Sequence, residues 1–402
     1  MTHLFTFLVY LIEGLLAVYA LYTVSYTFIS SLAGLFRKKK TFPVDAYKRK
    51  FAVLIPAYKE DAVIVSVAKQ ALKQNYQTKR FDIVIIADSL KSETLAALNA
   101  LPIKVIEVRF EKSTKVKALN AAFATLPSDY DVALILDADN TMEANCLELF
   151  NAAFKSGYKA VQGRRTAKNR NASFAVLDGL SETINNHIYR KGQNALGFAA
   201  SLIGSGMAFD YKILVSTLSE MTSIGGFDRE LEVRLLGQGI SAYYLEEAVI
   251  YDEKVDNPEN FGRQRTRWIA AQYLYLFKYF GKGMKAFFKG HFSYFNSSIL
   301  RNIQLPRIIN LGLLGMIVGI VLVFHSFFSH SLFFWISIYL IYLVAFIFAI
   351  PFRLYDKGFF QSLFRLPQAF FIMVLSLFKM RSATDKFIHT PHSQVETEKP
   401  KE

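Results

Sequence analysis

No Asp, Glu, Lys or Arg occurs between residues 308 and 350. A stretch this long and apolar favours the interior of a lipid bilayer, where the backbone must satisfy its own hydrogen bonds and therefore forms helices. Polar residues interrupt its middle, namely His325, Ser326, Ser329, His330 and Ser331. The pattern predicts two transmembrane helices within residues 307–351, joined by a tight turn on the outer side of the membrane.

A second apolar segment lies near the start of the sequence. Residues 4–36 include one charged residue, Glu13, and are long enough for one tilted span, so we predict an anchor over residues 1–36. A cleaved signal peptide is the alternative, but the apolar run is too long and no basic residue precedes it. Basic residues at 37–40, Arg307 and Arg353 flank the spans, and by the positive-inside rule the central part of the chain is cytoplasmic. We expect a multi-pass protein of the cell membrane.

The C-terminal region is harder to assign. Its uncharged run, residues 366–378, is short for a span, and we expect a short interfacial or re-entrant helix over residues 362–380. This placement keeps the basic residues of segment 381–386 in the cytoplasm. The polar tail, residues 390–402, has the composition of a disordered segment.

Composition limits the partners. The chain is 52% hydrophobic, 20% charged and carries a net charge of +14, which fits a part-aqueous, part-membrane protein. Its basic residues gather near the predicted membrane edges and no nucleic-acid-binding signature is present, so we expect a lipid bilayer and phosphate substrates rather than nucleic acid. The lone cysteine, Cys146, fits a reducing compartment.

Between the membrane segments, short apolar runs alternate with helical patterns. The runs at 51–55, 81–87, 103–108 and 132–136 suit buried strands, and helical spacing occurs at 61–73, 93–100 and 115–125. This order predicts an α/β fold with a mostly parallel sheet, in which ligands bind at the carboxyl ends of the strands. Polar residues follow three of the strands: segments 56–60, 88–89 and 137–139.

Asp137 and Asp139 are two residues apart at a strand end, so both can reach one divalent ion. Carboxylate oxygens suit Mg²⁺ or Mn²⁺. A solvated turn is the alternative. Lys115 begins a predicted helix whose dipole adds positive potential for an anionic ligand. The alternative is a solvated, Lys-rich helix start that binds no ligand.

Gln264, Arg267 and Trp268 form a QxxRW motif just before the membrane helices. Gln264 and Arg267 can bind phosphate or sugar oxygens and Trp268 can stack on a sugar ring, although Arg and Trp are also common at bilayer interfaces. After the motif, aromatic or Met residues recur beside lysines over residues 272–300. This pattern predicts an amphipathic helix in the headgroup plane, with a core-packed helix as the alternative.

Together these motifs resemble the membrane-bound family 2 glycosyltransferases, which include cellulose, chitin, hyaluronan and poly-N-acetylglucosamine synthases and ceramide glucosyltransferases. The resemblance spans residues 51–268. In order, its motifs are Ile55-Pro56-Ala57-Tyr58-Lys59-Glu60, Asp88, Lys115 with Ala118-Leu119-Asn120, Asp137-Ala138-Asp139, Gly226-Phe227-Asp228-Arg229-Glu230-Leu231-Glu232, and Gln264-Arg265-Thr266-Arg267-Trp268. It implies a GT-A-like nucleotide-binding domain over residues 48–271.

The resemblance also implies roles for these residues. The expected donor-binding residues are Pro56, Tyr58, Glu60, Asp88, Lys115 and Asp137, with uridine as the commonest nucleotide. Asp139, with Asp137, would bind the metal; Gln264, Arg267 and Trp268 would bind the acceptor and the leaving diphosphate. Asp228 matches the catalytic base, although an Asp before a helix can also be its N-cap. Phe227 replaces the family's usual Glu before this Asp, and Ala87 replaces the first of a common Asp pair.

The expected function is inverting, metal-dependent transfer of a sugar from a nucleotide-diphosphate sugar to a saccharide or lipid-linked acceptor, plausibly in cell-surface polysaccharide synthesis. A non-processive glycolipid glycosyltransferase is the main alternative. Two further classes are a sugar-nucleotide pyrophosphorylase, which needs neither Asp228 nor spans, and a noncatalytic membrane scaffold. Three spans are few for a polymer channel, so a polymerase would need an export partner or an oligomer.

Overall fold

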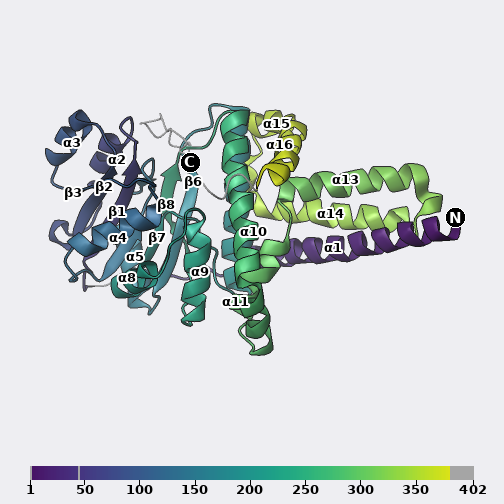
Figure 1. The fold of residues 1–402 in the computed structure, drawn as a ribbon, viewed down its shortest axis with the longest axis horizontal. Helices are drawn as coiled ribbons and strands as arrows, with labels where there is room; N and C mark the ends of the chain where they lie inside the picture. Colours follow the sequence, from purple (N-terminus) through teal and green to yellow (C-terminus); the bar gives the residue numbers. More distant parts are fainter. Residues whose placement is uncertain (1, 44–45, 381–402) are drawn as a thin grey trace.

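The computed structural model describes residues 2–43 and 46–380, and within them a mixed eight-stranded sheet forms the centre (Figure 1). The strand order is β3-β2-β1-β4-β7-β6-β8-β5. The strands are β1 (Phe51–Tyr58), β2 (Phe81–Asp88), β3 (Lys104–Val108), β4 (Val132–Ile135), β5 (Thr141–Met142), β6 (Ala160–Ala167), β7 (Met207–Asp210) and β8 (Tyr243–Asp252). Strands β3, β2, β1 and β4 are parallel, as are β6 and β8; β7 and β5 pair antiparallel with their neighbours. The predicted α/β fold is confirmed.

Helices cover both faces of the sheet (Figure 1). They are α2 (Ile64–Ala71), α3 (Ser92–Asn99), α4 (Lys115–Thr125), α5 (Cys146–Lys155), α6 (Ser173–Asn185), α7 (Gln193–Ala195), α8 (Tyr211–Ser219) and α9 (Phe227–Gly237), with a 3-10 turn η1 (Thr78–Arg80) and a π-helix η2 (Asn186–Gly192). Side chains of β1 alternate between two cores: Phe51, Val53 and Ile55 pack in one, Ala52 and Leu54 in the other. This two-sided burial explains why the strands read as continuous apolar runs.

Strand β1 is longer than the sequence predicts and includes Pro56. Strand β4 ends at Ile135, opposite Leu54, so Pro56 lies where β1 has only one neighbouring strand. A residue without an N–H is tolerated at such a position. Conversely, the predicted helix at 61–73 is shorter and forms only as α2.

Among the described residues, three helices are long and apolar enough to cross a membrane: α1 (Thr2–Phe36), α13 (Arg307–Phe324) and α14 (Leu332–Ala349). They form a bundle that projects from the α/β part (Figure 1). The turn η4 (His325–Phe327) begins the α13–α14 connection, where polar residues interrupt the apolar run. Glu13, the one charge in α1, is buried and accepts hydrogen bonds from the backbone N–H groups of Ser329 and His330 in this connection.

After α14 come a 3-10 turn η5 (Phe352–Leu354), α15 (Lys357–Leu363) and α16 (Leu366–Lys379). The last two helices meet at 52°, and as one bent unit they would make a fourth candidate span. Helix α16 packs against α10 and α13. The predicted cytoplasmic basic segment at 381–386 and the predicted disordered tail at 390–402 lie outside the described residues.

The QxxRW motif and the predicted amphipathic stretch belong to one helix, α10 (Pro258–Phe288), which crosses between the sheet and the bundle (Figure 1). No break separates residues 271 and 272, where the sequence suggests a domain boundary. Aromatic side chains of the stretch are exposed, notably Phe277, Phe280 and Phe287. The chain then continues through α11 (Phe292–Phe295), the π-helix η3 (Asn296–Leu300) and α12 (Arg301–Ile303) to α13.

Candidate active site

A cavity of about 1200 Å³ lies between the carboxyl edge of the sheet, α9, α10 and the start of the helical bundle. Every side chain that the sequence singles out lines it: Pro56, Tyr58, Glu60, Asp88, Lys115, Asp137, Asp139, Asp228, Gln264, Arg267 and Trp268. These residues come from strand ends, helix starts and the middle of α10. The fold therefore brings together groups that are as far apart in the sequence as Pro56 and Trp268.

At one end of the cavity, β1 and β2 finish side by side. The N–H of Lys59 donates to the carbonyl of Asp88 (3.1 Å), and the Ser89 hydroxyl donates to the Asp88 carboxylate (3.0 Å). Lys59 and Ser89 both have positive φ values, 56° and 59°. Each such conformation costs a non-glycine residue on the order of 1 kcal/mol, and paired strain of this kind is typical of ligand sites.

Lys115 and Asp137 form an ion pair inside the cavity. Thr114 caps α4, which places Lys115 in the first turn, and the Lys115 ammonium also donates to the carbonyl of Gly204 (2.7 Å). The backbone N–H of Asp137 donates to the Ser205 hydroxyl (2.9 Å). Asp137 is therefore fixed at both its backbone and its side chain.

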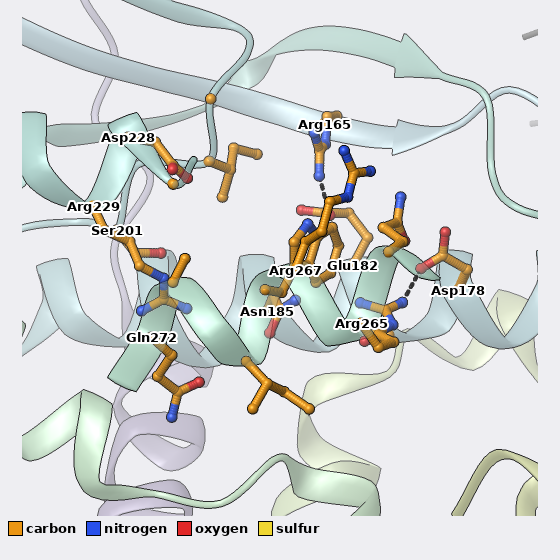
Figure 2. A pocket seen from close by; sticks show the side chains of 18 of the residues that line it. Arg165, Asp178, Glu182, Asn185, Ser201, Asp228, Arg229, Arg265, Arg267 and Gln272 are labelled. Carbon is orange, nitrogen blue, oxygen red and sulfur yellow. Dashed lines mark hydrogen bonds and ion pairs between the residues drawn. The ribbon is translucent and has the colours of Figure 1, made fainter. Parts of the chain in front are cut away.

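Arg165 extends this charged network, and sequence reasoning did not select it. Its guanidinium lies 2.9 Å from Glu182, 3.3 Å from Asp252 and 3.9 Å from Asp137. Burial alone would lower the pKa of Arg165, but these three carboxylates raise it well above its ordinary value. The group is thus a permanent buried cation beside Asp137; Figure 2 shows it next to Glu182.

Asp139 is the candidate metal ligand. Its two oxygens accept hydrogen bonds from the Asn140 amide (3.1 Å) and the Glu253 backbone N–H (2.8 Å), which fix its orientation. Within residues 2–43 and 46–380, no three His, Cys, Asp or Glu side chains cluster into a metal site. Mg²⁺ commonly needs only one or two protein carboxylates when substrate phosphates supply other oxygens, so the donor set fits a shared ion.

Asp228 lies in the first turn of α9, with Gly226 at the N-cap position, so the alternative role of Asp228 as N-cap is not what the helix shows. Burial raises the pKa of Asp228, and the charge of Arg229 limits the rise. The neighbouring Phe227 packs under Lys115, whose nitrogen is 5.3 Å from the ring centre. Gly204 passes close to the Asp228 carboxylate, so the Lys115 and Asp228 regions adjoin.

The α10 residues form another wall (Figure 2). The buried side-chain oxygen of Gln264 has no hydrogen-bond partner among the described residues and is available to a ligand. Burial lowers the pKa of Arg267, and the charge of Asp137 opposes that shift. Arg265 pairs with Asp178 and lies over the Trp268 ring, 4.2 Å from its centre, and so fixes the indole.

Comparisons with known proteins agree with this arrangement. The sequence model of the family described as "Glycosyltransferase like family 2" matches residues 48–271. A curated relative, "Probable glycosyltransferase YdaM" of Bacillus subtilis (strain 168), is 25% identical over 311 residues, which are 68% of this chain and 71% of the relative.

Among solved structures, the chain is similar to the mannosyltransferase PcManGT from Pyrobaculum calidifontis, determined in complex with GDP-Man and Mn²⁺. The TM-score is 0.55 at 15% identity, and the match covers 91% of this chain and 99% of that one. This likeness concerns the fold, and it extends over the helical bundle as well as the α/β part.

Proposed function

The chain belongs to the glycosyltransferase-like family 2 and is a glycosyltransferase; from that premise we propose that it transfers a sugar from a nucleotide-diphosphate sugar to a saccharide or lipid-linked acceptor at the cytoplasmic membrane face. One observation carries the proposal. A single cavity is lined by the strand ends, by Asp228 and by helices of membrane type. Donor, base and membrane-side acceptor can therefore meet in one place.

The donor fits the sheet end of the cavity. Pro56, Tyr58, Glu60 and Asp88 would hold the nucleoside, as the family resemblance implies. Lys115, Arg165 and Arg267 surround Asp137 and offer positive charge to the diphosphate. PcManGT holds GDP-Man and Mn²⁺; for this chain we propose a uridine donor, with guanosine as the competitor to be tested.

The reaction is a single displacement with inversion. The acceptor hydroxyl oxygen bonds to the anomeric carbon, its proton passes to the Asp228 carboxylate, and the bond between that carbon and the diphosphate oxygen breaks. Asp139, with Asp137, would hold Mg²⁺ or Mn²⁺, which when bound neutralises the diphosphate charge. Arg267 and Lys115 stabilise the departing diphosphate, while Gln264 and Trp268 orient the acceptor.

Replacement of the base tests this mechanism. Asp228→Asn keeps the size of the side chain but cannot take a proton, so transfer should fall at least about 100-fold while donor binding persists. The assay measures nucleotide-diphosphate release by purified full-length chain with a panel of labelled nucleotide sugars and Mn²⁺. Asp256→Asn, an exposed Asp outside the cavity, is the matched control and should retain activity. Normal turnover by Asp228→Asn would remove Asp228 from this role.

The same assay separates the other function classes. A pyrophosphorylase would release no nucleoside diphosphate from these donors; it would consume added pyrophosphate and release a nucleoside triphosphate and a sugar 1-phosphate. A scaffold would release nothing. Following the label into a lipid or into a long polymer then distinguishes a glycolipid transferase from a polysaccharide synthase, which would require an export partner or an oligomer.

A further inference from the structure

The cavity continues past α10 into the helical bundle. Beyond Arg307 the described residues that line it carry no charge, and most come from α13, α14, α15 and α16. The aliphatic or Met side chains are Ile308, Leu311, Leu343, Ile347, Ile350, Leu363, Leu366 and Met373, and the aromatic ones are Tyr339, Phe346, Tyr355 and Phe359. A growing polysaccharide needs many polar groups along its path, and the described lining of this limb offers only two polar side chains, Tyr339 and Tyr355. This apolar limb instead suits a hydrocarbon chain.

A group of cations lies where the apolar limb begins. The cations are Arg229, Arg301 and Arg307. Together with the neutral Gln304 they form what we name the inner arginine cluster; all four residues line the cavity. Within the cluster, Arg229 lies beside Asp228, away from Arg165 and Arg267 (Figure 2). Burial and the charge of Arg301 lower the pKa of Arg229, and the charges of Asp228 and Glu232 oppose that shift.

The cluster has more positive charge than its neighbours balance. Arg301 pairs with Glu232 at 2.7 Å. Arg229 donates to the neutral Asn302 amide oxygen (2.6 Å), and Arg307 donates to Ser181 (3.1 Å to the carbonyl); neither forms an ion pair within the described part of the chain. Asp228 and Glu232 offset part of the charge of Arg229, but the three arginines still exceed these two carboxylates by one charge. A part-buried cation without a nearby counter-charge is electrostatically unfavourable, and a bound anion would supply that charge.

The same cavity-lining residues carry unused hydrogen-bond donors. One terminal nitrogen of Arg301, one of Arg307 and the amide nitrogen of Gln304 are buried without a hydrogen-bond partner among the described residues. Gln304 is only 3% exposed, and its oxygen accepts from the Tyr189 hydroxyl (3.4 Å). Converging N–H donors and positive charge are the chemistry that recognises phosphate.

We propose that this limb binds the acceptor as an anionic lipid, with a phosphate on the inner arginine cluster and the hydrocarbon chain between α13, α14 and α16. The inference rests on the proposed transfer reaction and names its acceptor class. Arg229 directly follows Asp228 in α9, so a lipid phosphate held there places a nearby hydroxyl of the same headgroup next to the base. The apolar limb distinguishes this ligand from free phosphate or a free sugar phosphate.

Binding is tested by thermal unfolding of the detergent-solubilised full-length chain with three probes at equal concentration. Dioctanoyl phosphatidic acid carries both phosphate and chains, dioctanoylglycerol lacks the phosphate, and inorganic phosphate lacks the chains. We expect only the first to raise the melting temperature, because a ligand that binds the folded state stabilises it. An equal shift by either of the other two probes would overturn the proposal.

Variants then locate the phosphate. Arg307→Gln and Arg229→Gln should each weaken phosphatidic acid binding about tenfold or more, since each removes a charge-assisted hydrogen bond. Arg353→Gln removes an exposed arginine near the same membrane edge but outside the cavity, and should bind as the unaltered chain does. Unchanged affinity in both cluster variants refutes the assignment, and a fold defect in one leaves the other to decide.

Nucleotide release on the same preparation separates this inference from the proposed function. Asp139→Asn should retain the selective shift with phosphatidic acid, because Asp139 lies at the donor end. Nucleotide release without any preference for the anionic lipid refutes the inference alone. Selective lipid binding with no release from any donor refutes the proposed function instead.

Discussion

Asp228 carries the catalytic proposal, and its environment makes a pH-dependent prediction. Burial raises its pKa, and the charge of Arg229 limits the rise. A general base acts only when deprotonated, so kcat/KM should increase with pH through this raised pKa, and its acid limb should lie above the ordinary Asp value of about 3.9. Arg229→Gln removes the cation, so the acid limb should move to higher pH.

The pH profile of nucleotide release measures this shift. Arg229→Lys keeps a positive charge at the position and should leave the acid limb close to that of the unaltered chain. An acid limb that is identical in Arg229→Gln would mean that Asp228 is not the group that titrates.

At the same scale, the sequence predicted Asp137 and Asp139, but not the buried charged network next to them. Asp137 and Asp139 stood out because they follow an apolar strand, where parallel sheets place ligands. Arg165, Glu182 and Asp252 did not, because a charge on a strand or helix usually means a solvated face. Only the fold shows that these three groups are buried together. Interpreting these three residues as solvated charges is wrong, because burial depends on tertiary neighbours rather than on the local sequence pattern.

Among the elements, the contact between α9 and α10 fixes the base against the motif helix. Gly226, at the start of α9, has φ 62°, and a Cβ built there would lie 2.6 Å from the Cβ of Ala271 on α10. Gly226→Ala should therefore cost on the order of 1–3 kcal/mol of stability and displace Asp228, lowering the rate of transfer. The measurements are thermal unfolding and nucleotide release.

Its neighbour provides the control. A Cβ at Gly225 would meet no atom within 4 Å, and this glycine does not have a positive φ. Gly225→Ala should thus be well tolerated. Equal stability of the two variants would contradict the account of how α9 meets α10.

Helix α10 includes the position, between residues 271 and 272, where the sequence suggests a boundary between two units. In its first half, Phe261 and Ile269 pack in one core with residues of α6 and α16. In its second half, Phe277 and Phe280 are exposed. The two halves have different buried faces because their neighbours differ, so their patterns suggest two units. The helix is nevertheless continuous, which gives the QxxRW motif and the exposed aromatic stretch a fixed relative position.

At the scale of the whole molecule, the arrangement of the bundle allows its orientation in the membrane to be tested at a few exposed residues. The cavity lies at the end of α13 that begins with Arg307, so donor entry from the cytoplasm requires this end to face inward. The polar connection between α13 and α14 would then face outward. Helices α15 and α16 are bent by 52° and pack on α10 and α13, which leaves an interfacial pair and a bent span as the two possibilities.

Cysteine labelling in intact cells determines both the orientation of the bundle and the placement of α15 and α16. Cys146 is the only cysteine in the sequence; it is fully buried, and burial raises the pKa of its thiol to about 12, so it should not react. Ser326→Cys, in the exposed connection, should react with a membrane-impermeant maleimide, whereas Lys39→Cys should react only after permeabilisation. Lys379→Cys should behave like Lys39→Cys if α15 and α16 stay at the inner interface, as we predict. Labelling of Lys379→Cys from outside would instead make that pair a fourth span, and labelling of Lys39→Cys from outside would reverse the orientation on which the donor's access depends.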